Sequence, residues 1–257
     1  MTRALVIGAI ASSALVIGAA IGVRFRLPQR LLAMLLAFAA GSLITALAFE
    51  LFEDSYDHGG VVPAGLGFAA GAIVFTAVSA WLDRRVAHPA DVAGSPKLDT
   101  AAASDEPAFS PSSVGSAAGL ALLAAVTLDG VPENLALGVT LGEEGGGLVL
   151  LVAIFLSNLP ESLVGAASMK EQGWSTVRVI GTWTACAALL TGAVLLGAGV
   201  LSGLSGAGIS IPLAFAAGAV VASLADTLMP EAYEKGGSAS ALATAAGFLV
   251  SYVLSVA

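Results

Sequence analysis

Charged residues are scarce in this chain of 257 residues: 11% are Asp, Glu, Lys or Arg, whereas 57% are hydrophobic. Soluble domains carry about 25% charged residues, which is enough to give a globule a hydrated surface. The low share of charge therefore excludes a soluble globular protein. Small residues abound, with 31 glycines among them, and small residues let helices approach closely in lipid. The composition predicts an integral membrane protein made of helices.

Cysteine and basic residues are also few. The single cysteine, Cys186, lies in an apolar segment, which excludes an intramolecular disulfide and a cysteine metal cluster. Ten Lys and Arg stand against 18 Asp and Glu, giving a net charge of −8, so a basic nucleic-acid surface is excluded. No segment resembles a phosphate-binding loop, which leaves ATP-driven transport without support. Neither nucleic acid as a partner nor a prosthetic group is expected.

Eight apolar stretches are each long enough, at about 20 residues, to cross a bilayer as a helix. They are 4–22, 31–52, 63–82, 115–141, 147–169, 175–200, 209–232 and 237–256. Alternating strands of the kind that build a membrane barrel are absent, since the apolar runs are continuous. The expected fold is an all-α integral membrane protein with eight transmembrane helices, which places the lipid bilayer among its partners.

One long polar segment, 86–113, is rich in Pro, Ser and Asp, and its composition predicts a variable loop. It separates transmembrane helices 1–3 (residues 1–85) from helices 4–8 (114–257) within one membrane domain. If the spans alternate in direction, nine of the ten basic residues fall on the side of this loop. By the positive-inside rule that side is cytoplasmic. We therefore expect a multi-pass protein of the inner (plasma) membrane with both termini outside.

Two pairs of segments repeat within the chain. Residues 38–60 and 215–237 share ten of 23 positions without a gap, and both begin with Phe-Ala-Ala-Gly. Residues 128–134 (LDGVPEN) and 156–162 (LSNLPES) also correspond. The members of each pair belong to spans of opposite direction. The chain therefore reads as three helices, a central pair and three inverted helices, a layout typical of secondary transporters that bind substrate at the midplane.

The central pair carries acidic residues next to prolines. Asp129 and Glu133 are four residues apart and share one face of a helix, as do Ser157 and Glu161 in the next span. A carboxylate at the centre of a bilayer costs about 2.5–3.5 kcal/mol. A divalent cation offsets this cost and the repulsion between carboxylates, and proton binding competes with it. These positions predict a site for a metal cation.

The same residues resemble the Zrt/Irt-like (ZIP) family of metal transporters, bacterial type, and the resemblance covers nearly the whole chain. Against the family's span 4 motif His-Asn-x-x-Glu-Gly, Asp129 occupies the histidine position and Glu133 the glutamate position. In span 5, Ser157 and Asn158 occupy the two polar positions, and Glu161 matches the glutamate. The resemblance implies uptake of a divalent metal, usually zinc and in some members iron or manganese. It also implies dimeric carriers, so a homodimer is expected.

The candidate metal ligands come from both repeats. They are Asp129, Glu133, Asn134, Ser157, Asn158 and Glu161, with Asp226 and Glu50 as secondary ligands or proton acceptors on the path. No histidine lies in a span, and the sixth span carries no carboxylate. Oxygen-only sites favour harder ions such as Mn²⁺, whereas zinc prefers some nitrogen or sulfur. Zinc is expected first because of the family resemblance, with manganese, iron and cadmium as further candidates.

Other functions fit the same features. The chain is also consistent with a membrane protein that binds metal without transporting it, or with a carrier of another small polar solute. Alternatively, the acidic residues are protonated and serve only in helix packing, and the prolines only kink the helices. An enzyme is not expected, because an intramembrane aspartyl protease needs two facing aspartates and span 5 offers a glutamate and no aspartate.

Overall fold

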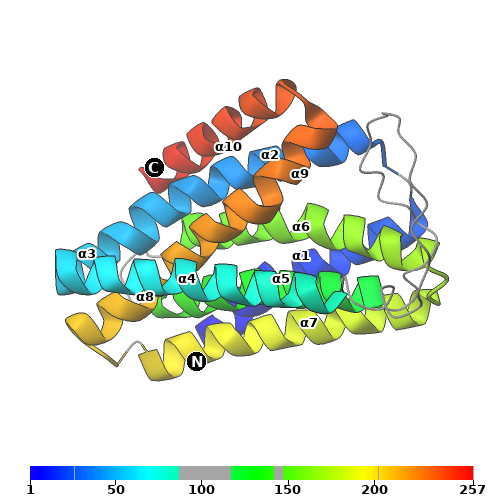
Figure 1. Ribbon diagram of the computed structural model, residues 1–257. Helices are drawn as coiled ribbons and strands as arrows, with labels where there is room; N and C mark the ends of the chain where they lie inside the picture. Colours follow the sequence, from blue (N-terminus) through cyan, green and yellow to red (C-terminus); the bar gives the residue numbers. More distant parts are fainter. Residues whose placement is uncertain (26, 87–116, 142–146, 202, 257) are drawn as a thin grey trace, which may run out of the picture.

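Every predicted apolar stretch forms a helix in the computed structural model (Figure 1). The structure describes residues 1–25, 27–86, 117–141, 147–201 and 203–256, and within them the side chains of 82–83, 85–86, 117–125, 129 and 201 are not described. In the described ranges no strand is present, which confirms the all-α prediction. Apart from its first residue, the loop predicted at 86–113 lies outside the described residues.

The helices have these bounds. In chain order they are α1 (Thr2–Arg24), α2 (Gln29–Ala46), α3 (Glu53–Gly59), α4 (Val61–Val86), α5 (Ala117–Thr140), α6 (Leu148–Glu171), α7 (Thr176–Leu196), α8 (Ala207–Ser223), α9 (Met229–Gly236) and α10 (Ala239–Ser255). Three stretches of π-helix, which carry one residue more per turn than the α-helix, continue α2, α7 and α8. They are η1 (Leu47–Phe52), η2 (Gly197–Leu201) and η3 (Leu224–Leu228).

Six helical stretches in the described part of the chain are long and apolar enough to cross a membrane. They are Thr2–Arg24, Gln29–Gly59, Val61–Trp81, Leu148–Glu171, Thr176–Val200 and Ala207–Gly236. The last helix, Ala239–Ser255, is also apolar but shorter. These helices make the chain a multi-pass membrane protein.

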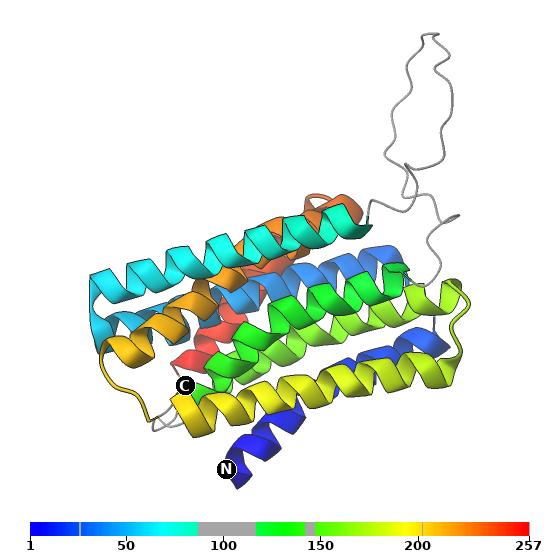
Figure 2. The same cartoon turned by 60° about the horizontal axis from the view of Figure 1, so that its bottom comes forward.

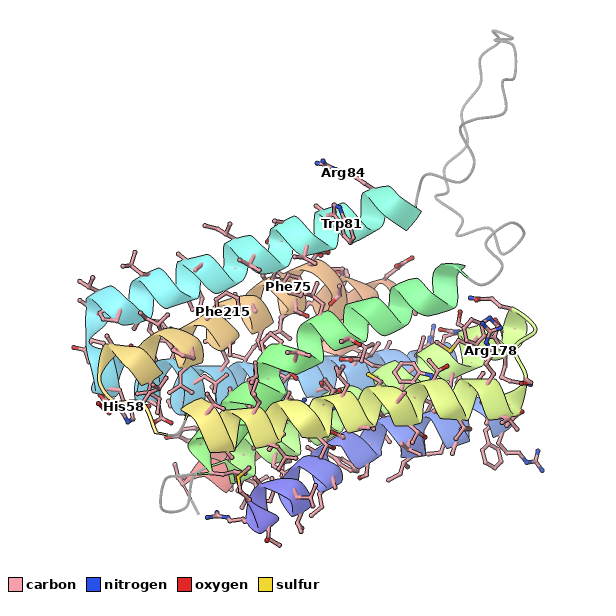
Figure 3. The ribbon with its side chains drawn as sticks, turned by 90° about the horizontal axis from the view of Figure 1, so that it is seen from below. His58, Phe75, Trp81, Arg84, Arg178 and Phe215 are labelled. Carbon is pink, nitrogen blue, oxygen red and sulfur yellow. The ribbon has the colours of Figure 1, made fainter. Side chains whose placement is uncertain are left out.

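The helices lie along one common direction, so the bundle has two ends (Figures 1 and 2). Both termini lie toward the end formed by α3 and the start of α8. His58 lies at this end, whereas Arg84 and Arg178 lie toward the opposite end (Figure 3). These positions agree with the sorting of basic residues to one side of the predicted spans.

The segments 38–60 and 215–237 have the same local structure. In each, an α-helix passes into a π-helical turn and a second short α-helix: α2–η1–α3 and α8–η3–α9. Each ends at a glycine with positive φ, Gly60 at 76° and Gly237 at 62°, which a residue with a Cβ rarely adopts. Their N–H groups donate to the carbonyls of Tyr56 and Tyr233. The two segments run in opposite directions (Figures 1 and 2).

Glycines bring two helix pairs into backbone contact: α2 with α10, and α4 with α8. A Cβ at any of them would meet a carbonyl of the facing helix: Thr244 at Gly41, Phe38 at Gly247, Phe215 at Gly71 and Phe68 at Gly218. Buried hydroxyls add hydrogen bonds, with Ser42 paired to Ser251 and Thr45 donating to the Phe248 carbonyl at 3.0 Å. Small residues thus allow the close helix packing that lipid-embedded bundles require.

Candidate functional site

The buried apolar side chains form two separate clusters, and four helices pass through both. On α1, Ala11 belongs to the first cluster and Leu15 to the second. On α6, Ile154 belongs to the first and Ala166 to the second. The boundary between the two clusters falls between Val126 and Ala136 on α5, and between Leu190 and Val194 on α7. On α1, α5 and α6 the boundary between the clusters includes the middle of the helix, whereas on α7 it lies near the end of the helix.

Buried polar residues occupy this gap. We call them the polar layer, which consists of Ser12, Glu133, Asn134, Ser157 and Asn158. Their exposed fractions are 1%, 4%, 0%, 2% and 1%, respectively. Burying polar groups between two apolar clusters is unfavourable unless each finds a partner. The layer is therefore a place where this chain accepts a cost in stability, as functional sites often do.

Three atoms of the polar layer have no hydrogen-bond partner among the described residues. They are Ser12 Oγ, Asn134 Oδ1 and Asn158 Nδ2. The other end of one amide is engaged, because Asn134 Nδ2 donates to the Gly130 carbonyl at 2.8 Å. The Asn158 amide can present its oxygen after a flip, since the two ends of an amide are nearly interchangeable in shape. The layer therefore offers free oxygen ligands.

Both helices that carry the motifs contain a proline just before the acidic residue. Pro132 and Pro160 have no N–H, so the carbonyls of Leu128 and Leu156 lose their usual helical donor. Glu133 on α5 is buried, whereas Glu161 on α6 is half-buried. Each proline thus removes one helical N–H donor from the turn that precedes its glutamate.

The single thiol of the chain lies beside α5. Cys186 is buried on α7. The Cys186 sulfur lies 3.7 Å from the hydroxyl of Thr127 on α5. This contact joins α5, the helix that carries Glu133, to α7.

The structure places the two secondary candidates away from the layer. Both carboxylate oxygens of Glu50 accept hydrogen bonds from the start of α6, from Val149 N at 3.2 Å and Leu150 N at 2.9 Å. Leu150 precedes Ser157 by seven residues, which is about 10 Å along a helix. Asp226 is exposed on η3 and accepts from the hydroxyl of Ser79 on α4 at 2.7 Å.

Of the predicted ligands, the structure describes all side chains except that of Asp129. Among the described residues, no three His, Cys, Asp or Glu side chains form a group able to hold a metal ion. The layer instead combines Glu133 with neutral amides and hydroxyls. Sequence reasoning did not find Ser12, because a serine in an Ala-rich span gives no periodic or motif signal. Only its burial beside the gap identifies it.

Replacing Glu50 with alanine should destabilise the start of α6. The carboxylate satisfies two helix N–H groups and interacts favourably with the helix dipole, so its loss should cost about 1–2 kcal/mol. Thermal unfolding in detergent measures the change, and hydrogen exchange at the Val149 and Leu150 amides locates it. Glu53→Ala, at an exposed position on α3, is the control. Equal exchange in Glu50→Ala and the native protein would contradict this role.

Comparison with protein-family models and with curated proteins finds no match for this chain. Its function is therefore inferred from the motifs and from the geometry of the polar layer.

Proposed function

We propose that this protein is a secondary transporter that carries a divalent metal cation into the cytoplasm through the polar layer. The observation that carries the proposal is a layer of buried polar side chains, with Glu133 at 4% exposure, between two apolar clusters of one helical bundle. The protein acts on no chemical bond and needs no prosthetic group, because the cation is its cargo.

Burial of Glu133 supports a cation as the ligand. An ionised carboxylate in apolar surroundings is strongly unfavourable, and a bound divalent cation removes most of this cost. Neutral oxygens of Asn134 and Asn158 complete the coordination without adding repulsion between negative charges. Glu161, which is only half-buried, is the proposed ligand for the ion as it enters or leaves the layer.

The proposal includes eight transmembrane helices in a 3+2+3 arrangement with an inverted repeat. The like-folded segments α2–η1–α3 and α8–η3–α9, which run in opposite directions, support it. The glycine contacts support it as well, because Phe38 with Gly247 and Phe215 with Gly71 occupy corresponding positions of the two halves. The proposed protein lies in the inner membrane with both termini outside, forms a homodimer and belongs to the ZIP family.

The ligand set supports a broad choice of metal. Carboxylate, amide and hydroxyl oxygens suit Mn²⁺ and Fe²⁺, whereas Zn²⁺ and Cd²⁺ gain from nitrogen or sulfur. The single thiol, that of Cys186, is buried on α7 and contacts Thr127 on α5, the helix that carries Glu133. Zinc remains the first candidate on the strength of the motif resemblance.

Flux into proteoliposomes tests the proposal. Vesicles that contain the purified protein should accumulate ⁶⁵Zn²⁺ or ⁵⁴Mn²⁺. Unlabelled Zn²⁺, Mn²⁺, Fe²⁺ and Cd²⁺ should each inhibit this uptake, more strongly the more tightly the ion binds. Protein-free vesicles are the control. Binding in detergent without flux would favour the metal-binding protein that does not transport. Absence of both would favour a carrier of another small polar solute.

A further inference from the structure

We propose that Ser12 forms the α1 wall of the polar layer and gives the bound cation a neutral oxygen ligand. This inference rests on the proposed function, since it assigns one more residue to the same site. It adds α1 to the helices that hold the ion, although the motifs occur only on α5 and α6. Three features of Ser12 support this role: its position along α1, the missing hydrogen-bond partner of its hydroxyl, and the ability of a hydroxyl oxygen to bind a cation.

Ser12 lies in the middle of α1. Its neighbours Ala11 and Leu15 belong to different apolar clusters, so Ser12 sits at the boundary between them. Six residues later α1 is in backbone contact with the motif of α6, because a Cβ at Gly18 would meet the Leu159 carbonyl. The helix α1 runs beside α6 and α7 over this length (Figure 3).

A direct hydrogen bond connects the same part of α1 with the motif helix. Ser162 Oγ donates to the carbonyl of Ala14 at 3.3 Å and to that of Asn158 at 2.7 Å. Ala14 is two residues after Ser12, and Asn158 is itself part of the polar layer. This contact fixes the segment of α1 around Ser12 against the segment of α6 that carries the candidate ligands.

The hydroxyl of Ser12 differs from those of other buried serines in its bonding. Ser42 pairs with Ser251, Ser55 donates to the Ser210 carbonyl at 2.9 Å, and Ser240 donates to the Ala232 carbonyl at 2.7 Å. Ser12 Oγ is buried and has no partner among the described residues. The adjacent Ser13, which is less buried, donates to the Ile10 carbonyl at 2.6 Å. A serine in this part of α1 can thus donate to a carbonyl of its own helix. The position of Ser12 on α1 therefore does not by itself explain why its hydroxyl has no partner.

A cation in the layer supplies the missing partner. A hydroxyl oxygen has two lone pairs, and a buried acceptor left unpaired costs free energy that a bound ion recovers. Asn134 Oδ1 is a second unpaired acceptor in the same layer. Two neutral oxygens raise the coordination number of the ion without adding negative charge to the site. This suits ions that take several oxygen ligands.

Paired serine variants test the assignment in proteoliposomes. Ser12→Ala should raise the half-saturating concentration for Mn²⁺ about tenfold, the effect of losing one hydrogen-bond-strength contact to a charged group. Ser13→Ala should leave it unchanged. The two substitutions remove the same atom from adjacent positions of α1, so they differ only in which hydroxyl is lost.

Replacing the same serines with cysteine distinguishes a metal ligand from a residue with a merely structural role, because only a change of ligand alters the preference between metals. A thiolate binds Cd²⁺ far better than Mn²⁺. Ser12→Cys should therefore raise the ratio of Cd²⁺ to Mn²⁺ affinity at least tenfold over the native protein, whereas Ser13→Cys should not. The native Cys186 is present in every variant and cancels in the comparison.

The outcomes separate this inference from the proposed function. If Ser12→Ala matches Ser13→Ala and Ser12→Cys gains no preference for Cd²⁺, while Glu161→Gln loses flux, Ser12 is not a ligand although the transporter proposal stands. If native vesicles move no ion, the transporter proposal fails. Equilibrium Cd²⁺ binding to detergent-solubilised Ser12→Cys and Ser13→Cys then still decides the role of Ser12, because only a residue facing a cation site gains affinity.

Discussion

Metal uptake should be lost when Glu133 or Glu161 is replaced with glutamine. Glutamine keeps the shape and one oxygen of the side chain but removes the negative charge that holds a divalent cation. Removing one member of a buried charge pair costs about 3–5 kcal/mol, which corresponds to a loss of affinity of at least a hundredfold. Initial rates of ⁶⁵Zn²⁺ and ⁵⁴Mn²⁺ uptake measure the effect, and we expect flux near the protein-free background in both variants.

A thermal measurement separates loss of the site from loss of the fold. A ligand that binds only the folded state raises its stability in proportion to the logarithm of ligand concentration. The native protein should therefore show a rising Tm with added Zn²⁺ or Mn²⁺, and Glu133→Gln and Glu161→Gln should not. Glu234→Gln, at an exposed position on α9, should keep both flux and the metal-dependent shift. Undiminished uptake in both glutamine variants would disprove the transport site.

The second large effect is expected on stability, when Gly218 is replaced with alanine. The new Cβ would meet the Phe68 carbonyl on α4, and neither backbone can move aside without separating α4 from α8. Overpacking of a close contact costs about 1–3 kcal/mol, and the upper end applies here because both groups are backbone. Unfolding in detergent should show the loss. Gly41→Ala should weaken the pairing of α2 with α10 for the same reason.

A glycine with free space provides the matched control for this effect. Gly65 lies six residues before Gly71 on α4, and a Cβ there would meet no heavy atom within 4 Å. Gly65→Ala should be neutral or slightly stabilising, because alanine favours the helix by about 1 kcal/mol over glycine. Equal stability of Gly218→Ala and Gly65→Ala would show that the helix pair does not depend on this contact.

The helices were predictable because each is a long apolar run, which periodicity and length identify without knowledge of tertiary contacts. Their ends were less so: the stretches predicted to end at 52 and 232 continue to Gly59 and Gly236. Short polar helices follow the apolar part there, and hydropathy gives no signal for them. The π-helical turns were not predicted either, since one extra residue per turn leaves no mark on an apolar sequence.

The candidate site was predictable to the extent that polar residues in an apolar span must be buried or paired. This reasoning selected Glu133, Asn134, Ser157 and Asn158, each of which is buried. It could not place Glu50, whose partners Val149 and Leu150 are about a hundred residues away. Nor could it place Asp226, because Ser79 is 147 residues distant. Such pairings are decided by tertiary packing.

The pairing of α2 with α10 has a consequence for biosynthesis. The Thr45 hydroxyl bonds a carbonyl 203 residues later in the chain. At a translation rate of about 5–20 residues per second, that partner emerges roughly 10–40 s after Thr45. During this interval the small-residue face of α2 stands in the membrane without its final neighbour. The packing of α2 is thus completed only after α10 has left the ribosome, and a chain that stops before α10 leaves α2 without this partner.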